Sequence, residues 1–192
     1  MSSPAHAAHA DTLPARLRAA TGESVFKCYQ CGKCTAGCPL AIEMDFAPNQ
    51  VMRLLQHGTP KLEEEALRSL AIWLCLTCET CAARCPKDVN LPQIMEYLRR
   101  ESLRRGLVNP RAKDILAFHE AFLDTIRRTG RLYEVGLISQ YKLKTLHLLQ
   151  DVLSAPGLLM RGKLKLLPHK IEGQNEVERI FGRTQEIQAD KP

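Results

Sequence analysis

The chain places four cysteines within eleven residues, and it does so twice. The first group lies in KCYQCGKCTAGCP at residues 27–39, and the second lies in LCLTCETCAARCP at residues 74–86. Both groups have the spacing CxxCxxCxxxCP, and together they contain all eight cysteines of the chain. Thiolates are ligands for zinc and for iron-sulfur clusters, so this repeated spacing indicates a metal centre.

The spacing favours iron-sulfur clusters over the other uses of cysteine. Disulfide scaffolds are usually shorter and distribute their cysteines between loops. A zinc ribbon needs two CxxC units separated by a longer stretch, whereas here three thiols follow one another at two-residue gaps. The pattern is that of bacterial 4Fe-4S ferredoxins, in which the fourth cysteine binds the other cluster when two are present. Zinc and a three-iron form of the cluster are the alternatives.

We therefore predict two 4Fe-4S clusters with crossed ligation. The expected ligands of cluster 1 are Cys28, Cys31, Cys34 and Cys85. The expected ligands of cluster 2 are Cys75, Cys78, Cys81 and Cys38. Because every iron would then have a protein thiolate, no coordination position remains for a substrate, and electron transfer is expected rather than catalysis. Glu79 lies inside the second loop and predicts a lower reduction potential for cluster 2.

Composition agrees with a soluble protein that has a cofactor in its centre. Of the 192 residues, 45% are apolar and 25% are charged, while only 5% are aromatic. The formal charge of +6 would fall to about +2 if each cluster site added roughly −2, so the basic residues need no nucleic acid as partner. No apolar run approaches the roughly 18 residues of a membrane span, and the first residues lack the apolar region of a signal peptide. We expect a cytoplasmic protein.

The remaining sequence is helical in pattern, with no alternating strand pattern of any length, so we predict an all-α fold. Helices are expected at 48–58, 59–74, 90–106 and 109–130, with one or two more within 131–155. The predicted domains are a flexible tail at 1–20, a dicluster domain at 21–106, a helical extension at 107–183 and a disordered tail at 184–192. His119 is expected to pack on the apolar face of the 109–130 helix. Four arginines near Gly106 form either a solvated helix end or a docking patch for an acidic partner: Arg99, Arg100, Arg104 and Arg105.

Two such cysteine motifs separated by a helical connector resemble the α-helical ferredoxin domain. The chain is also similar to the C-type subunit of heterodisulfide reductase over about residues 20–182, including the closing stretch LLMRGKLKLLPHKIEGQNEVERIF at 158–181. The eight cysteines occupy the ligand positions of that family.

This resemblance implies an electron-transfer subunit between a flavin-containing A-type subunit and a cysteine-rich B-type subunit, with no substrate site of its own. An iron-sulfur subunit of a glycolate-oxidase-like or membrane-anchored dehydrogenase is the alternative function. A module in which clusters only stabilise the fold is a third possibility, although one cluster would suffice for that.

Overall fold

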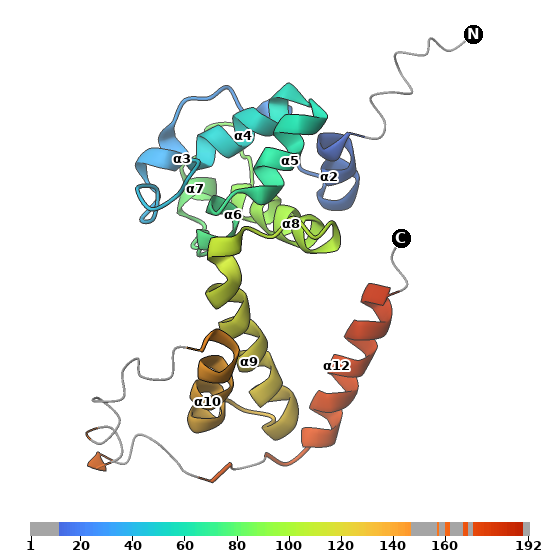
Figure 1. Cartoon of the computed structure of the whole chain (residues 1–192). Coiled ribbons are helices and arrows are strands. Elements are labelled where there is room, and N and C mark those ends of the chain that lie inside the picture. The colour runs from blue at the N-terminus through green and yellow to red at the C-terminus, as the bar shows by residue number, and fades with distance from the viewer. Residues whose placement is uncertain (1–11, 147–156, 158–159, 162–166, 169–170, 190–192) are drawn as a thin grey trace. The chain divides into compact units, whose positions relative to one another are not determined.

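The computed structural model describes residues 12–146, 157, 160–161, 167–168 and 171–189 (Figure 1). The ordered elements in these residues are helices, with no β-strand among them, which confirms the predicted all-α fold. The chain divides into two compact units, Met1–Ala112 and Lys113–Pro192, which we describe separately. The division follows Ala112, whereas we predicted a domain boundary after Gly106.

Unit 1 is built from short helices joined by loops. In chain order they are α2 (Leu13–Thr21), a 3-10 turn (Val25–Lys27), α3 (Lys33–Ala36), α4 (Pro48–His57), α5 (Pro60–Arg68), α6 (Ala71–Leu74), α7 (Thr80–Ala83), α8 (Leu91–Arg104) and a second 3-10 turn (Pro110–Ala112). Helices α2, α4, α5 and α8 have a proline in their first two positions. Proline suits these positions because its missing N–H would have no helical partner there.

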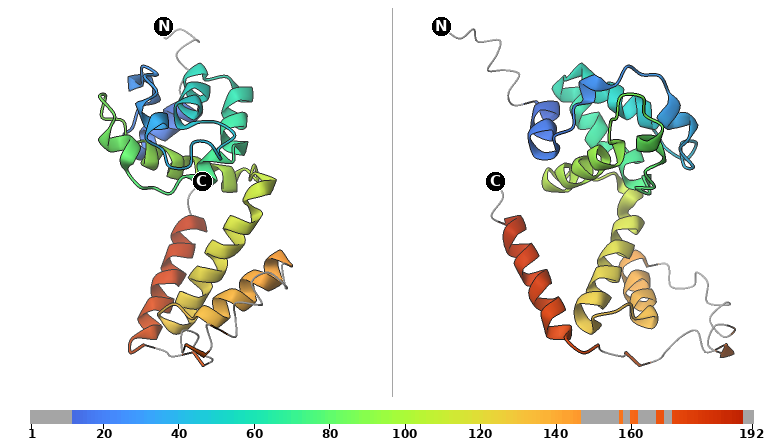
Figure 2. Two further views of the ribbon diagram at one scale, coloured as in Figure 1. Left: turned by 90° about the vertical axis from the view of Figure 1, so that its left-hand side faces the viewer. Right: turned by 180° about the vertical axis from the view of Figure 1, so that it is seen from behind.

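The core of unit 1 is aliphatic, and Trp73 is the one aromatic side chain among its described buried residues. It forms where α5 packs against α4 and α8 and where α2 packs against α8 and α4 (Figure 2). The helices contribute fully buried Leu, Ile, Val and Met side chains, each of which stabilises the fold by about 1.5–3 kcal/mol. The largest are Leu13, Leu17, Met52, Leu55, Leu67, Ile72, Ile94, Met95 and Leu98.

The N-terminal part of unit 1 differs from the predicted flexible tail at 1–20. Helix α2 begins at Leu13, and the side chains of Leu13 and Leu17 are completely buried. The Leu13 amide also donates a hydrogen bond to the Glu63 carboxylate at 3.0 Å, which ties α2 to α5. Two leucines four residues apart are too short a pattern to reveal a helix whose burial depends on α8 and α4.

The helix predicted at 59–74 is interrupted, because Asp45 supplies an alternative set of hydrogen bonds. The Asp45 carboxylate accepts from the Ser69 hydroxyl at 2.7 Å and from the backbone amides of Leu70 at 2.7 Å and Ala71 at 2.9 Å. Burial raises the pKa of Asp45, but these hydrogen bonds outweigh burial and hold the pKa below its usual value. Helix α5 therefore ends at Arg68, and α6 starts afresh and leads into Cys75.

Replacing Asp45 with Ala is expected to lower the free energy of unfolding by about 2 kcal/mol, because two buried amides and a hydroxyl lose their acceptor. Since α6 positions Cys75, the Asp45→Ala protein should also release iron to a chelator faster than wild type. Denaturant unfolding and timed iron release of the iron-loaded protein check both effects. The exposed neighbour Glu43 provides the control, and a Glu43→Ala protein that loses iron equally fast would contradict a specific role of Asp45.

Unit 2 contains α9 (Lys113–Thr129), α10 (Glu134–Thr145) and α12 (Gln174–Ala189), and α9 packs against both of the other helices (Figure 2). The buried line of α9 consists of Ala121, Thr125 and Thr129. These residues recur every four positions, so they share one side of the helix, and their small side chains allow close approach.

This buried line differs from the apolar face that the sequence suggested for α9. His119 was expected to pack on that face, but it is exposed, as are the apolar side chains of Phe118 and Leu123. The Phe118 ring instead lies 6.3 Å from the Phe122 ring and 6.1 Å from the Tyr141 ring. At the other end of the unit, α12 continues to Ala189, which corrects the disordered tail predicted at 184–192 for residues 184–189.

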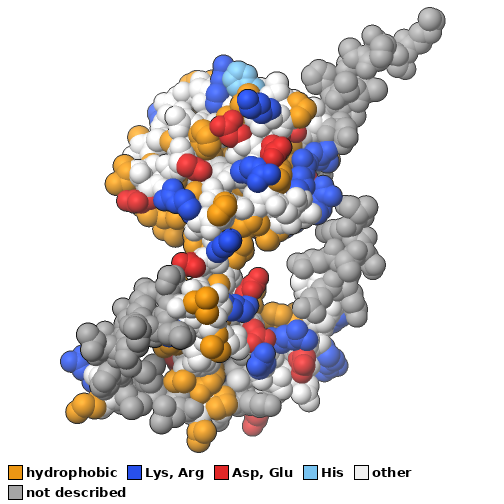
Figure 3. All heavy atoms as spheres, in the orientation of Figure 1, with side chains coloured by type: hydrophobic (Ala, Val, Ile, Leu, Met, Phe, Trp, Pro, Cys, Tyr) orange, Lys and Arg blue, Asp and Glu red, His pale blue; other side chains and the backbone are white. Residues whose placement is uncertain are grey.

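Among the described residues, no helix is both long enough and apolar enough to cross a bilayer. On the face shown in Figure 3, Lys and Arg side chains are interspersed with Asp and Glu side chains over unit 1. The net charge of +6 is therefore not gathered into one basic patch on that face.

Candidate metal centre

The two cysteine loops have the same backbone conformation, with each residue of the second loop 47 positions after its equivalent in the first. Gln30 and Gly32 in the first loop have positive φ angles of 64° and 76°, and the equivalent Thr77 and Glu79 have 52° and 63°. Residues other than glycine rarely adopt such angles. Each loop then enters a four-residue helix, α3 or α7. The spacing of the cysteines is thus reproduced in three dimensions and not only in the sequence.

This backbone directs amide groups at the thiols in equivalent ways. The Lys33 amide donates to Cys31 and holds the pKa of that thiol below its usual value. At the equivalent place, the Thr80 hydroxyl and then the Thr80 amide lower the pKa of Cys78, whose sulfur lies 3.5 Å from the hydroxyl oxygen. Such N–H and O–H groups stabilise negative charge on sulfur, and a metal cluster requires its cysteines as thiolates.

Helices α3 and α7 pack against each other and bring the two loops together. A close contact connects equivalent positions, since a Cβ atom on Gly37 would collide with the guanidinium of Arg84. Glycine at position 37 therefore makes room for the arginine of the other loop. The residues directly after this pair are the fourth cysteines, Cys38 and Cys85.

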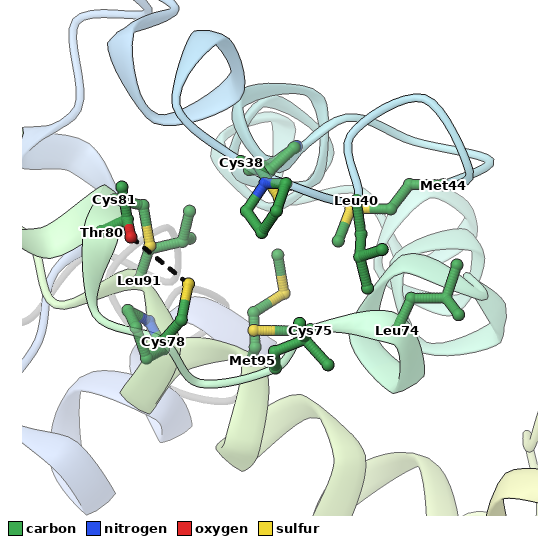
Figure 4. A pocket seen from close by; sticks show the side chains of 14 residues that line it. Cys38, Leu40, Met44, Leu74, Cys75, Cys78, Thr80, Cys81, Leu91 and Met95 are labelled. Carbon is green, nitrogen blue, oxygen red and sulfur yellow. Dashed lines mark hydrogen bonds between the residues drawn. The ribbon is translucent and has the colours of Figure 1, made fainter.

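One cavity of unit 1 is lined by four thiols that come from both loops. Cys38 of the first motif lies in it together with three cysteines of the second motif, Cys75, Cys78 and Cys81 (Figure 4). Apart from Thr80, the other lining residues are apolar: Pro39, Leu40, Met44, Pro48, Leu74, Leu76, Leu91, Pro92 and Met95. The predicted ligands of cluster 2 thus surround a single apolar cavity.

Three of the predicted ligands of cluster 1 lie near Tyr29: Cys28, Cys31 and Cys85. A hydrogen bond between its hydroxyl and Cys31 raises the pKa of Tyr29, and the negative charges of the Cys31, Cys85 and Cys28 thiolates raise it further. Burial raises the pKa of Cys34, and the Cys28 thiolate adds to that effect. Cys85, from the second motif, is therefore a neighbour of the first-motif thiols.

The two sets of thiols are adjacent. Burial raises the pKa of Cys81 to about 11, and the thiolates of Cys75 and Cys34 raise it as well. Cys75 belongs to the predicted set of cluster 2, and Cys34 belongs to the set of cluster 1. Cys31 and Cys78 are exposed, whereas the other six cysteines are partly covered.

The residues present fit iron-sulfur clusters by their chemistry. Within the described part of the chain, no three His, Cys, Asp or Glu side chains converge tightly enough to hold a single metal ion. A 4Fe-4S cluster instead takes one thiolate on each of its four irons. Four thiols around an apolar, cysteine-lined cavity provide the donor set for such a group.

Further hydrogen bonds to the cysteine sulfurs come from residues that the sequence did not single out. The Gln30 amide donates to the Cys28 sulfur at 3.6 Å, and the Val89 backbone amide donates to the Cys85 sulfur at 3.4 Å. Gln30 lies inside the first motif, so its position in the sequence already hinted at proximity. Nothing in the sequence marks Val89 apart from its place four residues after Cys85.

The arginines near Gly106 do not form a uniform free patch, because three of the four donate hydrogen bonds within unit 1 and the fourth lies over an aromatic ring. Arg99 donates to the backbone carbonyls of Ile72 and Cys75. Arg104 and Arg105 both donate to the buried carboxylate of Glu101, at 2.8 Å and 2.6 Å. Arg100 lies over the Tyr97 ring, 6.0 Å from its centroid. The four arginines, for which a docking patch was one of two alternatives, are therefore largely engaged in internal contacts.

Glu101 is expected to stabilise unit 1 in a pH-dependent way. The hydrogen bond from Arg104 and then that from Arg105 lower its pKa from 4.5 to about 2, although burial acts in the opposite direction. Because folding lowers this pKa, the stabilisation is complete above about pH 4.5 and is lost as the pH falls toward 2. Both arginines are partly exposed to solvent, so we expect Glu101→Gln to reduce the free energy of unfolding at pH 7 by only about 1–2 kcal/mol.

Urea unfolding of the iron-loaded protein at pH 7, 5.5 and 4 checks this expectation. The difference between wild type and Glu101→Gln should be constant at the two higher pH values and smaller at pH 4. A Glu64→Gln protein is a suitable control, because Glu64 forms an exposed ion pair with Arg68 one turn away. A difference that grew at pH 4 would contradict the assigned pKa shift.

Comparison with known families bears on the type of metal centre. Residues 24–89 match the model of the 4Fe-4S dicluster domain. All eight cysteines lie within this dicluster domain, and the match confirms the predicted 4Fe-4S ferredoxin type of fold. Unit 2 lies outside the matched residues.

The chain is similar to curated proteins named as the C-type subunits of heterodisulfide reductases, as the sequence suggested. It is 32% identical over 103 residues to the C-type subunit of the H2:CoB-CoM heterodisulfide, ferredoxin reductase of Methanothermobacter thermautotrophicus, a match that covers 54% of each chain. It is 37% identical over 83 residues to the C-type iron-sulfur subunit of the CoB-CoM heterodisulfide reductase of Methanopyrus kandleri, covering 43% of this chain and 42% of the relative. A third relative, the C-type subunit of the ferredoxin:CoB-CoM heterodisulfide reductase of Methanosarcina acetivorans, is 32% identical over 99 residues, which is 51% of this chain and 38% of the relative.

These matches are shorter than the resemblance inferred over residues 20–182, since they span 83 to 103 residues. The chain spans about half the length of the curated relatives it matches. The closing stretch at 158–181, which also suggested a C-type subunit, lies partly outside the residues that the structure describes.

Proposed function

We propose that this chain is the electron-transfer subunit of a heterodisulfide reductase-like complex. In this proposal, cluster 1 is held by Cys28, Cys31, Cys34 and Cys85, and cluster 2 is held by Cys75, Cys78, Cys81 and Cys38. Each cluster, when bound, would supply a centre that takes up and releases one electron. The setting would be the reducing cytoplasm, where thiols stay free of disulfides.

The main support for crossed ligation is the cavity in Figure 4, where Cys38 lines the same space as three cysteines of the other motif. The proximity of Cys85 to Tyr29, Cys28 and Cys31 supports the reciprocal exchange. The closeness of Cys34 to Cys81 supports two adjacent centres, as electron transfer over short gaps requires.

The protein residues of this site have three tasks in the proposed relay. Eight thiols would fill the coordination positions of the iron and would leave none for a substrate. Apolar side chains such as Leu91 and Met95 limit the access of water to the second set of thiols. The exposed cysteines Cys31 and Cys78 give each set one edge at the surface, where a partner can approach.

The proposed partners are a flavin-containing A-type subunit and a cysteine-rich B-type subunit. Affinity purification of the tagged chain from its native cells should recover both, with about eight iron atoms per chain. Recovery of a flavin oxidase or a membrane subunit in their place would contradict the proposal and favour a dehydrogenase. Clusters that cannot be reduced reversibly would indicate a purely structural role.

The electronic prediction is independent of partner identity. After chemical reduction, electron paramagnetic resonance should show two interacting one-electron centres in the purified chain. A spectrum with one isolated spin at full iron content would contradict the adjacent arrangement of the two sets.

A further inference from the structure

Two equivalent segments ahead of the metal centre are held by side chains in the same way. In the first, the Gln56 side-chain amide donates to the backbone carbonyls of Val25 at 2.9 Å and Cys28 at 2.6 Å. In the second, the Arg99 guanidinium donates to the carbonyls of Ile72 and Cys75. Ile72 follows Val25 by 47 positions, and Cys75 follows Cys28 by the same number. We call these two side chains the latches of the first and second loop.

The latches come from corresponding helices. Gln56 lies on α4, which packs against the turn at Val25–Lys27, and Arg99 lies on α8, which packs against α6 (Figure 1). Each of these helices is the first long helix after the fourth cysteine of its own motif. The shared contacts fix the backbone at the first cysteine of each loop. The equivalent backbone carbonyls are therefore held by a neutral amide in the first half and by a cation in the second half.

The Arg99 charge stays near the second set of thiols. A guanidinium remains protonated at any working pH, and its hydrogen bonds to the carbonyls of Ile72 and Cys75 hold this charge beside the second set of thiols. Carbonyl oxygens are neutral, so its two hydrogen bonds position the charge without cancelling it. Arg99 is half-buried, and the charge is therefore screened less by solvent than that of an exposed arginine.

The first latch lacks such a charge. Its amide oxygen accepts a hydrogen bond from Gln30 at 3.2 Å, and the same Gln30 nitrogen lies 3.6 Å from the Cys28 sulfur. Dipoles of neutral amides stabilise added negative charge less than a nearby cation does. On this ground, the second latch stabilises a reduced, more negative centre more strongly than the first latch does.

We propose that Arg99 is a positioning residue that fixes the backbone of Cys75 and raises the reduction potential of cluster 2 relative to cluster 1. This rests on the proposed function, because it requires a cluster at each set of thiols. The proposal reverses the order of the two reduction potentials that we predicted from Glu79 in the sequence, where cluster 2 had the lower potential. Glu79 is exposed, so solvent and salt weaken its field, whereas Arg99 is half-buried beside Cys75.

The deciding experiment replaces Arg99 with Gln, which copies the first latch onto the second. Potentiometric titration of the iron-loaded chain, followed by electron paramagnetic resonance, measures the reduced-to-oxidised ratio of each cluster. We expect Arg99→Gln to lower this ratio for cluster 2 about tenfold at a fixed potential, a shift of about 59 mV for one electron. Cluster 1 should change less than twofold. The Cys38→Ala protein assigns the signals, because it lacks the fourth ligand proposed for cluster 2.

Arg100→Gln is the matched control, since it removes the same charge from the adjacent, exposed position over Tyr97. It should leave both ratios within twofold of wild type. Arg99→Lys keeps the charge but not the two-pronged donor, and it should keep the ratio of cluster 2 while iron release from the chain becomes faster. Equal shifts in Arg99→Gln and Arg100→Gln, or no shift in either, would overturn the proposal.

A reciprocal variant keeps the test decisive if Arg99→Gln does not retain iron. Gln56→Arg places the cation at the first latch and should raise the ratio of cluster 1 instead. No change in that ratio would also count against the proposal. Failure of the underlying function is distinguishable, because it appears in the wild-type chain itself, as fewer than two reducible clusters.

Discussion

Replacing Cys38 with Ala is expected to remove the cluster bound by the second motif and to leave the cluster bound by its own motif. Cys38 lines the cavity of Cys75, Cys78 and Cys81, so its loss deprives that set of the fourth ligand. Iron content should fall from about eight to about four atoms per chain. Alkylation followed by mass spectrometry should find Cys75, Cys78 and Cys81 modified.

The matched control for this experiment is Cys85→Ala, for which the opposite pattern is expected. Its three freed thiols should be those of the first motif, while the second motif stays protected. Both variants should contain about the same amount of iron, so the alkylation pattern is the result that distinguishes them. Modification of Cys28, Cys31 and Cys34 in the Cys38→Ala protein would show that each motif fills its own cluster, and crossed ligation would be wrong.

Removing the iron is expected to unfold the cysteine loops while much of unit 1 stays folded. Helices α3, α6 and α7 have four residues each, and helices this short are unstable without support from elsewhere. Helices α4, α5 and α8 have their own buried aliphatic core. We therefore expect hydrogen exchange at residues 33–36 and 80–83 to become at least about a hundredfold faster, equivalent to about 2.8 kcal/mol.

Hydrogen exchange of the full chain before and after chelation tests this expectation, with α9 of unit 2 as the internal reference. Exchange in α8 should rise less than in α3 and α7. The loose loops would expose apolar residues such as Leu40 and Leu74, so iron-free protein should also aggregate more readily. Unchanged protection at residues 33–36 and 80–83 would mean that protein contacts alone hold the loops.

The sequence was most informative where chemistry depends on exact spacing. The two CxxCxxCxxxCP motifs predicted a 4Fe-4S domain, and the family match confirms that type of domain. The starts of α4 at Pro48 and of α8 at Leu91 were also predictable, because Pro48, Pro92 and the Asn90 cap act through their immediate neighbours. These features depend on neighbouring residues only, so they can be predicted without knowledge of the rest of the fold.

Features that depend on distant contacts were not predictable from one sequence. Asp45 ends a helix 24 residues away by bonding to the Ser69 hydroxyl, and no spacing rule marks that pair. Arg99 belonged to a run of arginines that suggested a surface patch, yet it points to a backbone carbonyl 24 residues earlier in the chain. The helix at Leu13 was missed because its burial comes from partners that follow it in the chain.

The constant offset of 47 positions indicates that the two halves of the dicluster domain are copies of one unit. Loop angles, the donors to Cys31 and Cys78, and the carbonyls held by Gln56 and Arg99 all repeat at that offset. A tandem duplication of one ancestral half-domain produces such a repeat. The two halves share their main-chain path at these positions but hold it with different side chains, so the repeat extends to φ angles at positions where the residues differ, such as Gln30 and Thr77.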